Sequence, residues 1–172
     1  MKKKPYYDMA RSILVYTDFS KQPVLAFKHG DKPEMAHFLG KLLLQADSDI
    51  WENVDCIVPV PLHWTRRLKR KYNQAGLLGE FIGRQKKIPF CPNILIRSKV
   101  TESQGHKKKR EREKNIKNAF RVTYPDRIRG KSVLLVDDVM TTGSTLNECA
   151  KMLKKSGARS VKAITVYRTI SN

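Results

Sequence analysis

Residues 131–145 read KSVLLVDDVMTTGST, and this stretch decides the fold of the chain. Four consecutive apolar residues, Val133 to Val136, predict a short strand buried on both faces, as parallel strands usually are. The acidic pair Asp137 and Asp138 follows directly. A turn rich in small hydroxyl side chains comes next, made of Thr141, Thr142, Gly143, Ser144 and Thr145.

After the turn, apolar residues recur at helical spacing, and Gly157 is placed to end the helix. This order of elements predicts a phosphate-binding cradle at the carboxyl edge of an open sheet. The two carboxylates suit the binding of a diol or of a hydrated Mg²⁺ ion. An acidic strand end before an ordinarily capped helix is the simpler interpretation, but it does not require two carboxylates, a glycine and four hydroxyls together.

The stretch VLLVDDVMTTGST resembles the phosphoribosyl pyrophosphate (PRPP) binding motif of type I phosphoribosyltransferases. The resemblance implies an α/β fold with a mostly parallel open sheet flanked by helices.

The chain of 172 residues suits a single domain over residues 1–172, and its hydrophobic fraction of 40% and charged fraction of 30% are typical of a globular protein. No apolar run approaches the roughly 20 residues of a membrane helix. The start, MKKKPYYDMAR, lacks the apolar core of a signal peptide, so we expect a cytoplasmic protein. Cys56, Cys91 and Cys149 are far apart and form no Cys-x-x-Cys pair, which predicts core cysteines.

The formal net charge of +19 is the most unusual feature of the composition. Such a charge attracts nucleic acid, anionic membranes or phosphorylated small molecules. A generally solvated basic surface would also account for it.

Strand patterns interleaved with helical ones predict a mostly parallel α/β sheet. The strands are expected over residues 12–16, 23–28, 55–60, 94–97, 119–122, 133–136 and 161–166. The first two precede the main alternation and predict a small N-terminal hood over about residues 1–30. A helix beginning near Asp31 and Pro33 is expected to bury one apolar face, made of Met35, Phe38, Leu39, Leu42 and Leu43.

Two polar segments are candidates to complete the site. The loop after Pro61 is strongly basic and includes Arg66 and Arg70, which suits a second anion, although a solvated basic turn has the same composition. Residues 98–118 contain the run KKKREREK at 107–114 and almost no apolar residues. A segment this long without a core face predicts a flexible lid loop or a solvated helix.

Three blocks of the chain resemble the competence protein ComF family, whose members are phosphoribosyltransferase-like proteins associated with DNA uptake. The first is PVPLHW at 59–64, continued by Arg66, Arg70 and the residues YNQA at 72–75. The second joins Leu95, Arg97, Thr101, Ser103, Gln104, Arg112, Asn115, Ala119 and Phe120. The PRPP motif is the third.

The ComF resemblance implies roles for single residues. Asp137 and Asp138 would hold the ribose 2′- and 3′-hydroxyls, directly or through Mg²⁺. Residues 141–145 would bind the 5′-phosphate with amides and hydroxyls, and Arg66, ahead of Arg70, would meet the pyrophosphate. Gln104 and Arg112 would belong to the lid.

The chain departs from related proteins at three points. Many ComF members begin with a cysteine-rich zinc-binding segment, which we expect to be missing here. Position 107 is Lys where the family often has Leu. Thr141 stands where purine-salvage transferases carry a catalytic Asp, so salvage of hypoxanthine or guanine by that mechanism is not expected.

The sequence is therefore compatible with three functions. The chain is an Mg·PRPP-dependent phosphoribosyltransferase with an unknown acceptor, a module of the DNA-uptake machinery that binds single-stranded DNA, or a sensor that binds PRPP without catalysis. A homo-oligomer is compatible with each of them.

Overall fold

The computed structural model describes residues 4–15, 35–62, 72–98 and 116–169. Its main sheet contains the strands β1 (Met9–Val15), β2 (Cys56–Pro59), β5 (Ser132–Met140) and β6 (Ser160–Arg168). A separate hairpin contains β3 (Leu95–Arg97) and β4 (Phe120–Val122). The helices are α2 (Met35–Leu43), α4 (Gln74–Lys86) and α6 (Ser144–Lys155), with short 3₁₀ turns η1 (Ser48–Ile50) and η2 (Pro125–Arg127).

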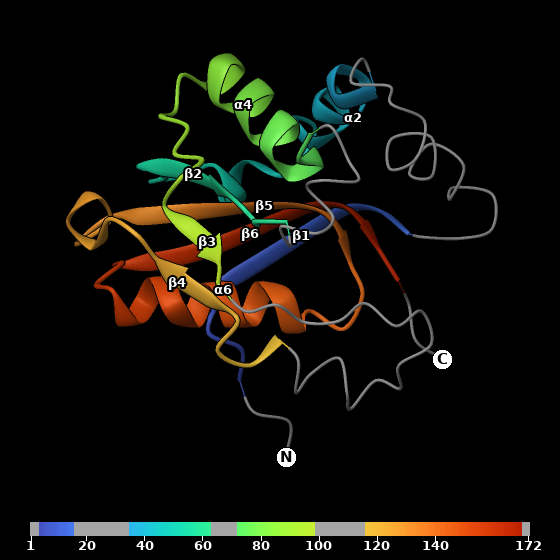
Figure 1. Cartoon of the computed structure of the whole chain (residues 1–172). Coiled ribbons are helices and arrows are strands. Elements are labelled where there is room, and N and C mark those ends of the chain that lie inside the picture. The colour runs from blue at the N-terminus through green and yellow to red at the C-terminus, as the bar shows by residue number, and fades with distance from the viewer. Residues whose placement is uncertain (1–3, 16–34, 63–71, 99–115, 170–172) are drawn as a thin grey trace.

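The main sheet has the order β1-β6-β5-β2, and every pair in it is parallel. β5 is a central strand that pairs with β2 through Cys56 and Val133 and with β6 through Asp137 and Thr165. The parallel sheet flanked by helices confirms the predicted α/β fold class (Figure 1).

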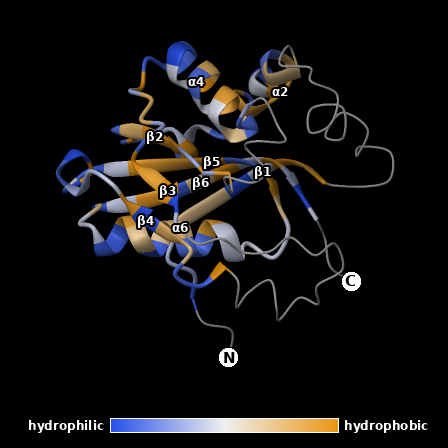
Figure 2. Cartoon of the chain, in the orientation of Figure 1, coloured by the Kyte–Doolittle hydropathy of each residue, from blue (hydrophilic) through white to orange (hydrophobic). Residues whose placement is uncertain are grey.

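Helices cover both faces of this sheet, α2 and α4 on one face and α6 on the other (Figure 1). Side chains of β5 therefore enter two different cores. Val133 and Leu135 pack in the core with α6, whereas Leu134 and Val136 pack in the core with α2 and α4. This double burial explains the unbroken apolar run of the strand, which Figure 2 shows as hydrophobic.

The buried face of α2 differs from the prediction. Ala36, Leu39, Gly40 and Leu43 are buried, whereas Phe38 is 53% exposed. A Cβ atom on Gly40 would lie only 2.3 Å from Cδ1 of Phe81 on α4. The small residues thus let the two helices approach closely, and this contact turns Phe38 toward solvent.

Two predicted placements in the sheet are wrong. Residues 94–97 were expected in the main sheet, but β3 pairs antiparallel with β4 in the separate hairpin. The strand predicted over residues 12–16 was assigned to an N-terminal hood, but the observed strand β1 covers residues 9–15 and is an edge strand of the main sheet. The second predicted hood strand, and Asp31 and Pro33 of the expected cap, lie outside the described residues.

Within the described part of the chain, no helix combines the length and the apolar composition needed to cross a bilayer. Cys56 and Cys149 are buried, as predicted for core cysteines, and Cys91 is partly buried. Burial and the neighbouring Cys91 raise the pKa of Cys56 to about 12.

Candidate functional site at the carboxyl edge of the sheet

The acidic pair lies inside β5 rather than after it, because the strand continues to Met140. Asp137 pairs in register with Thr165, and its Oδ1 atom accepts a hydrogen bond of 2.9 Å from the amide of Asp138. Successive side chains of a strand leave on opposite faces. Asp137 therefore continues the row of Val133 and Leu135 toward α6, where its carboxylate lies near the thiol of Cys149.

The turn after β5 is shaped by Gly143, which has a left-handed φ of +75° and caps α6. The hydroxyls of Thr142 and Ser144 are 2.7 Å apart, and the amide of Ser144 donates to the Thr142 hydroxyl at 3.3 Å. The first helical bond runs from the Asn147 amide to the Gly143 carbonyl at 2.9 Å. The amides of the first turn have no carbonyl acceptor within the helix, so they can bind an anion.

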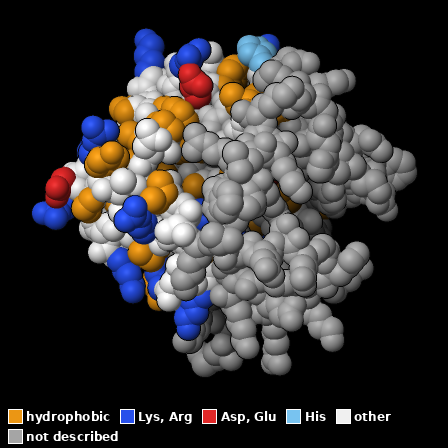
Figure 3. All heavy atoms as spheres, viewed as in Figure 1, with side chains coloured by type: hydrophobic (Ala, Val, Ile, Leu, Met, Phe, Trp, Pro, Cys, Tyr) orange, Lys and Arg blue, Asp and Glu red, His pale blue; other side chains and the backbone are white. Residues whose placement is uncertain are grey.

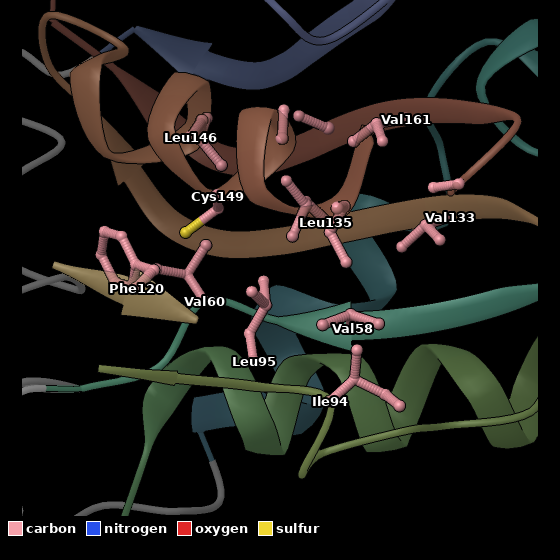
Figure 4. Packing of buried hydrophobic residues seen from close by; sticks show 14 of the residues in the cluster. Val58, Val60, Ile94, Leu95, Phe120, Val133, Leu135, Leu146, Cys149 and Val161 are labelled. Carbon is pink, nitrogen blue, oxygen red and sulfur yellow. The ribbon is translucent and has the colours of Figure 1, made fainter. Parts of the chain in front are cut away.

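The core beneath this turn fixes its position. Leu146 and Cys149 of α6 pack in one cluster with Leu135 of β5 and with Leu95 and Phe120 of the hairpin (Figure 4). Burial, followed by the nearby carboxylate of Asp137, raises the pKa of the Cys149 thiol well above its usual value. Cys149 is therefore a packing residue, since its thiolate form is disfavoured.

The loop predicted to meet pyrophosphate starts beside the acidic pair. β2 ends at Pro59 opposite Val136, and the amide of Val60 still donates to the carbonyl of Val136 at 2.9 Å. At the far end of the loop, the side-chain amide of Asn73 donates to the carbonyl of Val60 at 3.2 Å. Both ends of the basic segment are therefore held at the same edge of the sheet as Asp137. Arg66 and Arg70 themselves lie outside the described residues.

The predicted lid over residues 98–118 connects the two strands of the hairpin. Its ends meet where the amide of Ser98 donates to the carbonyl of Ala119 at 2.9 Å, and the guanidinium of Arg97 lies 5.6 Å from the Phe120 ring centroid. Gln104 and Arg112 lie outside the described residues, so the lid itself stays a prediction.

Glu148 fastens the hairpin end to α6, although no motif in the sequence marks this residue. This carboxylate is only 8% exposed and accepts the amide of Asn118 at 2.9 Å and the ammonium of Lys151 at 3.1 Å. The Lys151 spacing is a usual helical pair, but the bond to Asn118 joins segments that are distant in sequence.

The N-terminal segment also reaches the site, which no local sequence signal indicated. The amide of Tyr6 donates to Oδ1 of Asn147 at 2.6 Å, and the hydroxyl of Tyr7 lies beside Gly143. Asp8 bonds the ammonium of Lys154 at 2.7 Å, near the other end of α6.

Comparison with known proteins identifies the family. A profile of the phosphoribosyl transferase domain matches residues 30–172. Competence protein F of Haemophilus influenzae is 34% identical over 168 residues, which cover 94% of this chain and 73% of that protein. The DNA utilization protein YhgH of Salmonella typhimurium is 33% identical over 99% of this chain and 76% of its own length.

A third relative, competence protein ComFC of Bacillus subtilis, is 32% identical over 92% of this chain and 64% of that protein. Among solved structures, the glutamine PRPP amidotransferase of Bacillus subtilis superposes with a TM-score of 0.55 at 18% identity, over 81% of this chain and 30% of that chain. The superposition supports the fold alone. The chain therefore belongs to the phosphoribosyl transferase domain family and, within it, to the ComF family.

Proposed function

We propose that the chain binds PRPP together with Mg²⁺ and transfers phosphoribose to a nitrogen nucleophile. The observation that carries the proposal is the order of features at the end of β5. Asp137 and Asp138, the Gly143 turn and the first turn of α6 follow one another at the carboxyl edge, and the basic loop after β2 begins beside them.

Each feature suits one part of PRPP. The turn of residues 141–145 offers amides and hydroxyls to the 5′-phosphate. Asp137 and Asp138 would hold the ribose hydroxyls, directly or through the metal. Arg66 and Arg70 would bind the pyrophosphate, whose oxygens a guanidinium can contact in a bidentate fork.

Mg²⁺ fits the donors that are present. Its usual ligands in proteins are one or two carboxylates together with substrate phosphates. Among the residues that the structure describes, no group of three or more His, Cys, Asp or Glu side chains is placed to hold a metal. The chemistry therefore favours a metal that is shared with the ligand, where it would neutralise charge on the departing pyrophosphate.

The reaction would be a displacement at ribose C1. The bond from C1 to the pyrophosphate oxygen breaks and its electron pair leaves with pyrophosphate, while the nucleophile forms the new bond from nitrogen to C1 and loses a proton. Positive charge builds on the ring, and we expect the carboxylates of Asp137 and Asp138 to stabilise it. A closed lid would exclude water and prevent hydrolysis.

Calorimetry with PRPP, with and without Mg²⁺, tests the binding step. Pyrophosphate release during incubation with ammonia, alkyl amines and nucleobases then tests turnover. The double variant Asp137→Asn/Asp138→Asn should lose both PRPP binding and pyrophosphate release. The control Asp126→Asn changes an exposed side chain that pairs with Arg129, and it should keep both. If the protein binds PRPP but releases no pyrophosphate with any amine or base, it is a PRPP sensor and not a transferase. Absence of PRPP binding would overturn the proposal entirely.

A second candidate function, binding of single-stranded nucleic acid, is favoured by a basic surface at the amino edge of the sheet. Segments 121–131 and 154–159 adjoin through the bonds from the Gly130 amide to the Gly157 carbonyl and from the Arg159 amide to the Lys131 carbonyl, both 2.8 Å long. They carry one acidic residue, Asp126, and seven basic ones: Arg121, Arg127, Arg129, Lys131, Lys154, Lys155 and Arg159.

An exposed aromatic ring lies on the same surface. Tyr124 is 49% exposed, and the guanidinium of Arg127 lies 5.1 Å from its ring centroid. Stacking rings among cationic side chains are typical of surfaces that bind single strands. Figure 3 shows Lys and Arg side chains spread over the described part of one face, with few acidic ones among them.

Fluorescence anisotropy with a labelled oligothymidylate tests this second function. The logarithm of affinity should fall with the logarithm of salt concentration, and the variant Arg121→Gln/Arg127→Gln/Lys131→Gln should reduce that slope by about 2, at about 0.7 per phosphate contact. A matched control, Lys41→Gln/Lys86→Gln/Lys87→Gln, removes the same charge around α2 and α4. Equal effects of both variants would show that the binding follows net charge alone. Three points stay predictions: a role for the basic run at 107–114, a partnership with the DNA-uptake machinery, and a homo-oligomer.

A further inference from the structure

Residues 6–8 form a clasp along α6, the helix that begins at the proposed phosphate loop. One end of the clasp is the hydrogen bond of 2.6 Å from the Tyr6 amide to Oδ1 of Asn147, in the first turns of the helix. The other end is the carboxylate of Asp8, which accepts a hydrogen bond of 2.8 Å from the amide of Val161 and lies 2.7 Å from the ammonium of Lys154. The segment between these anchors is therefore fixed relative to the loop.

Tyr7 lies between the two anchors. Its ring is half-buried and packs against the core cluster that contains Leu146 and Cys149. Its hydroxyl points at the loop, because a Cβ atom added to Gly143 would come within 3.3 Å of the Tyr7 oxygen. Within residues 4–15, 35–62, 72–98 and 116–169 this hydroxyl makes no hydrogen bond, so the described part of the chain leaves it as a spare donor beside the loop.

We propose that the hydroxyl of Tyr7 donates a hydrogen bond to the phosphate that binds the turn of residues 141–145. The inference rests on the proposed function, since it adds one donor to the same site. A hydroxyl that donates to a charged phosphate oxygen forms one of the stronger hydrogen bonds in proteins. The clasp holds this donor in place before the ligand arrives, so little conformational entropy is lost on binding.

The variant Tyr7→Phe removes the hydroxyl and keeps the ring. Because the hydroxyl makes no bond within the described protein, the unfolding temperature should not change. Calorimetry with ribose 5-phosphate should show an affinity about tenfold weaker than that of the unchanged protein. Tyr6→Phe is the matched control, since Tyr6 is 49% exposed and its contact with Asn147 uses the backbone amide, and this variant should bind as the unchanged protein does.

Pyrophosphate as a second probe separates this contact from general damage to the site. The proposed contact is to the 5′-phosphate, so Tyr7→Phe should leave pyrophosphate affinity unchanged. Equal weakening for both probes, or unchanged ribose 5-phosphate affinity, would overturn the role of Tyr7 while the proposed function stands. An unchanged protein that binds neither ribose 5-phosphate nor PRPP would overturn the proposed function, and the role of Tyr7 with it.

Discussion

Gly143→Ala should destabilise the fold and weaken phosphate binding by the turn of residues 141–145. Gly143 has a φ of +75°, in the left-handed region where a side chain crowds the backbone. That conformation costs a non-glycine residue about 1–2 kcal/mol. The stiffer unfolded chain of the alanine variant offsets about 0.4–1 kcal/mol. The net loss of unfolding free energy is therefore about 1 kcal/mol, or roughly 2–4 °C in Tm for a chain of this size.

The same change should weaken phosphate binding. The new methyl group would lie 3.3 Å from the Tyr7 hydroxyl and 3.8 Å from the Met140 sulfur, so the loop or Tyr7 must move by a few tenths of an ångström. Hydrogen bonds from loop amides depend steeply on geometry. We expect ribose 5-phosphate affinity to fall by about tenfold, which corresponds to about 1.4 kcal/mol.

Gly130→Ala is the matched control for the backbone cost. Gly130 has a φ of +71°, but a Cβ atom there would meet nothing within 4 Å, and the residue lies at the amino edge, away from the loop. Urea unfolding should give both variants a similar loss of stability, and calorimetry should show weaker binding only for Gly143→Ala. Wild-type affinity in Gly143→Ala, or an equal loss of affinity in Gly130→Ala, would refute the link between this turn and phosphate.

Three further substitutions test the packing around the site. Glu148→Gln leaves the ammonium of Lys151 without its carboxylate in a largely buried position. Urea unfolding should therefore show that the free energy of unfolding falls by about 1–3 kcal/mol. A fall below about 0.5 kcal/mol would contradict a stabilising role for the pair. Burial raises the pKa of Asp8, but the hydrogen bonds from Lys154 and a backbone amide outweigh it and lower the pKa overall below 3.8. Ionised Asp8 therefore stabilises the fold above the pKa of the unfolded state, and this contribution is lost as the pH falls through the pKa of the folded state. Plots of unfolding free energy against pH for wild type and Asp8→Asn should converge below about pH 4. A constant gap between the two curves would argue against the pairing. Leu135→Ala leaves a cavity at a fully buried position of the central strand and should lower the free energy of unfolding by about 2–5 kcal/mol in the same assay. A smaller loss would show that Leu135 is not buried as described.

The elements that carry the proposed site and that the sequence predicted correctly are contiguous in the chain. β5, the Gly143 turn and α6 follow one another, so local periodicity and turn chemistry were enough to place them. The end of the strand was misjudged because two aspartates are unfavourable strand residues, yet pairing with β6 carries β5 through Asp137 to Met140. The proposed roles of the loops came from the family resemblance, since composition alone left them open.

Features that depend on distant contacts could not be predicted. Tyr6 and Asn147 are 141 residues apart, and nothing near Tyr7 in the sequence marks it as a neighbour of the loop. Phe38 was assigned to the core by its apolar side chain, although Gly40 decides which face of α2 meets α4. β3 has a strand pattern, but no periodicity tells a strand of the main sheet from one of a hairpin.

The strand order has a consequence for how the chain folds during synthesis. Of the described strands, β1 leaves the ribosome first, yet its partner in the sheet is β6, which is made last of them and inserts between β1 and β5. The bond between the hydroxyls of Ser12 and Thr165 spans 153 residues. Closing so long a loop is entropically costly and slow. Until β6 emerges, β1 lacks its partner among the described strands, so a nascent chain stalled before residue 160 should depend on chaperones to avoid aggregation.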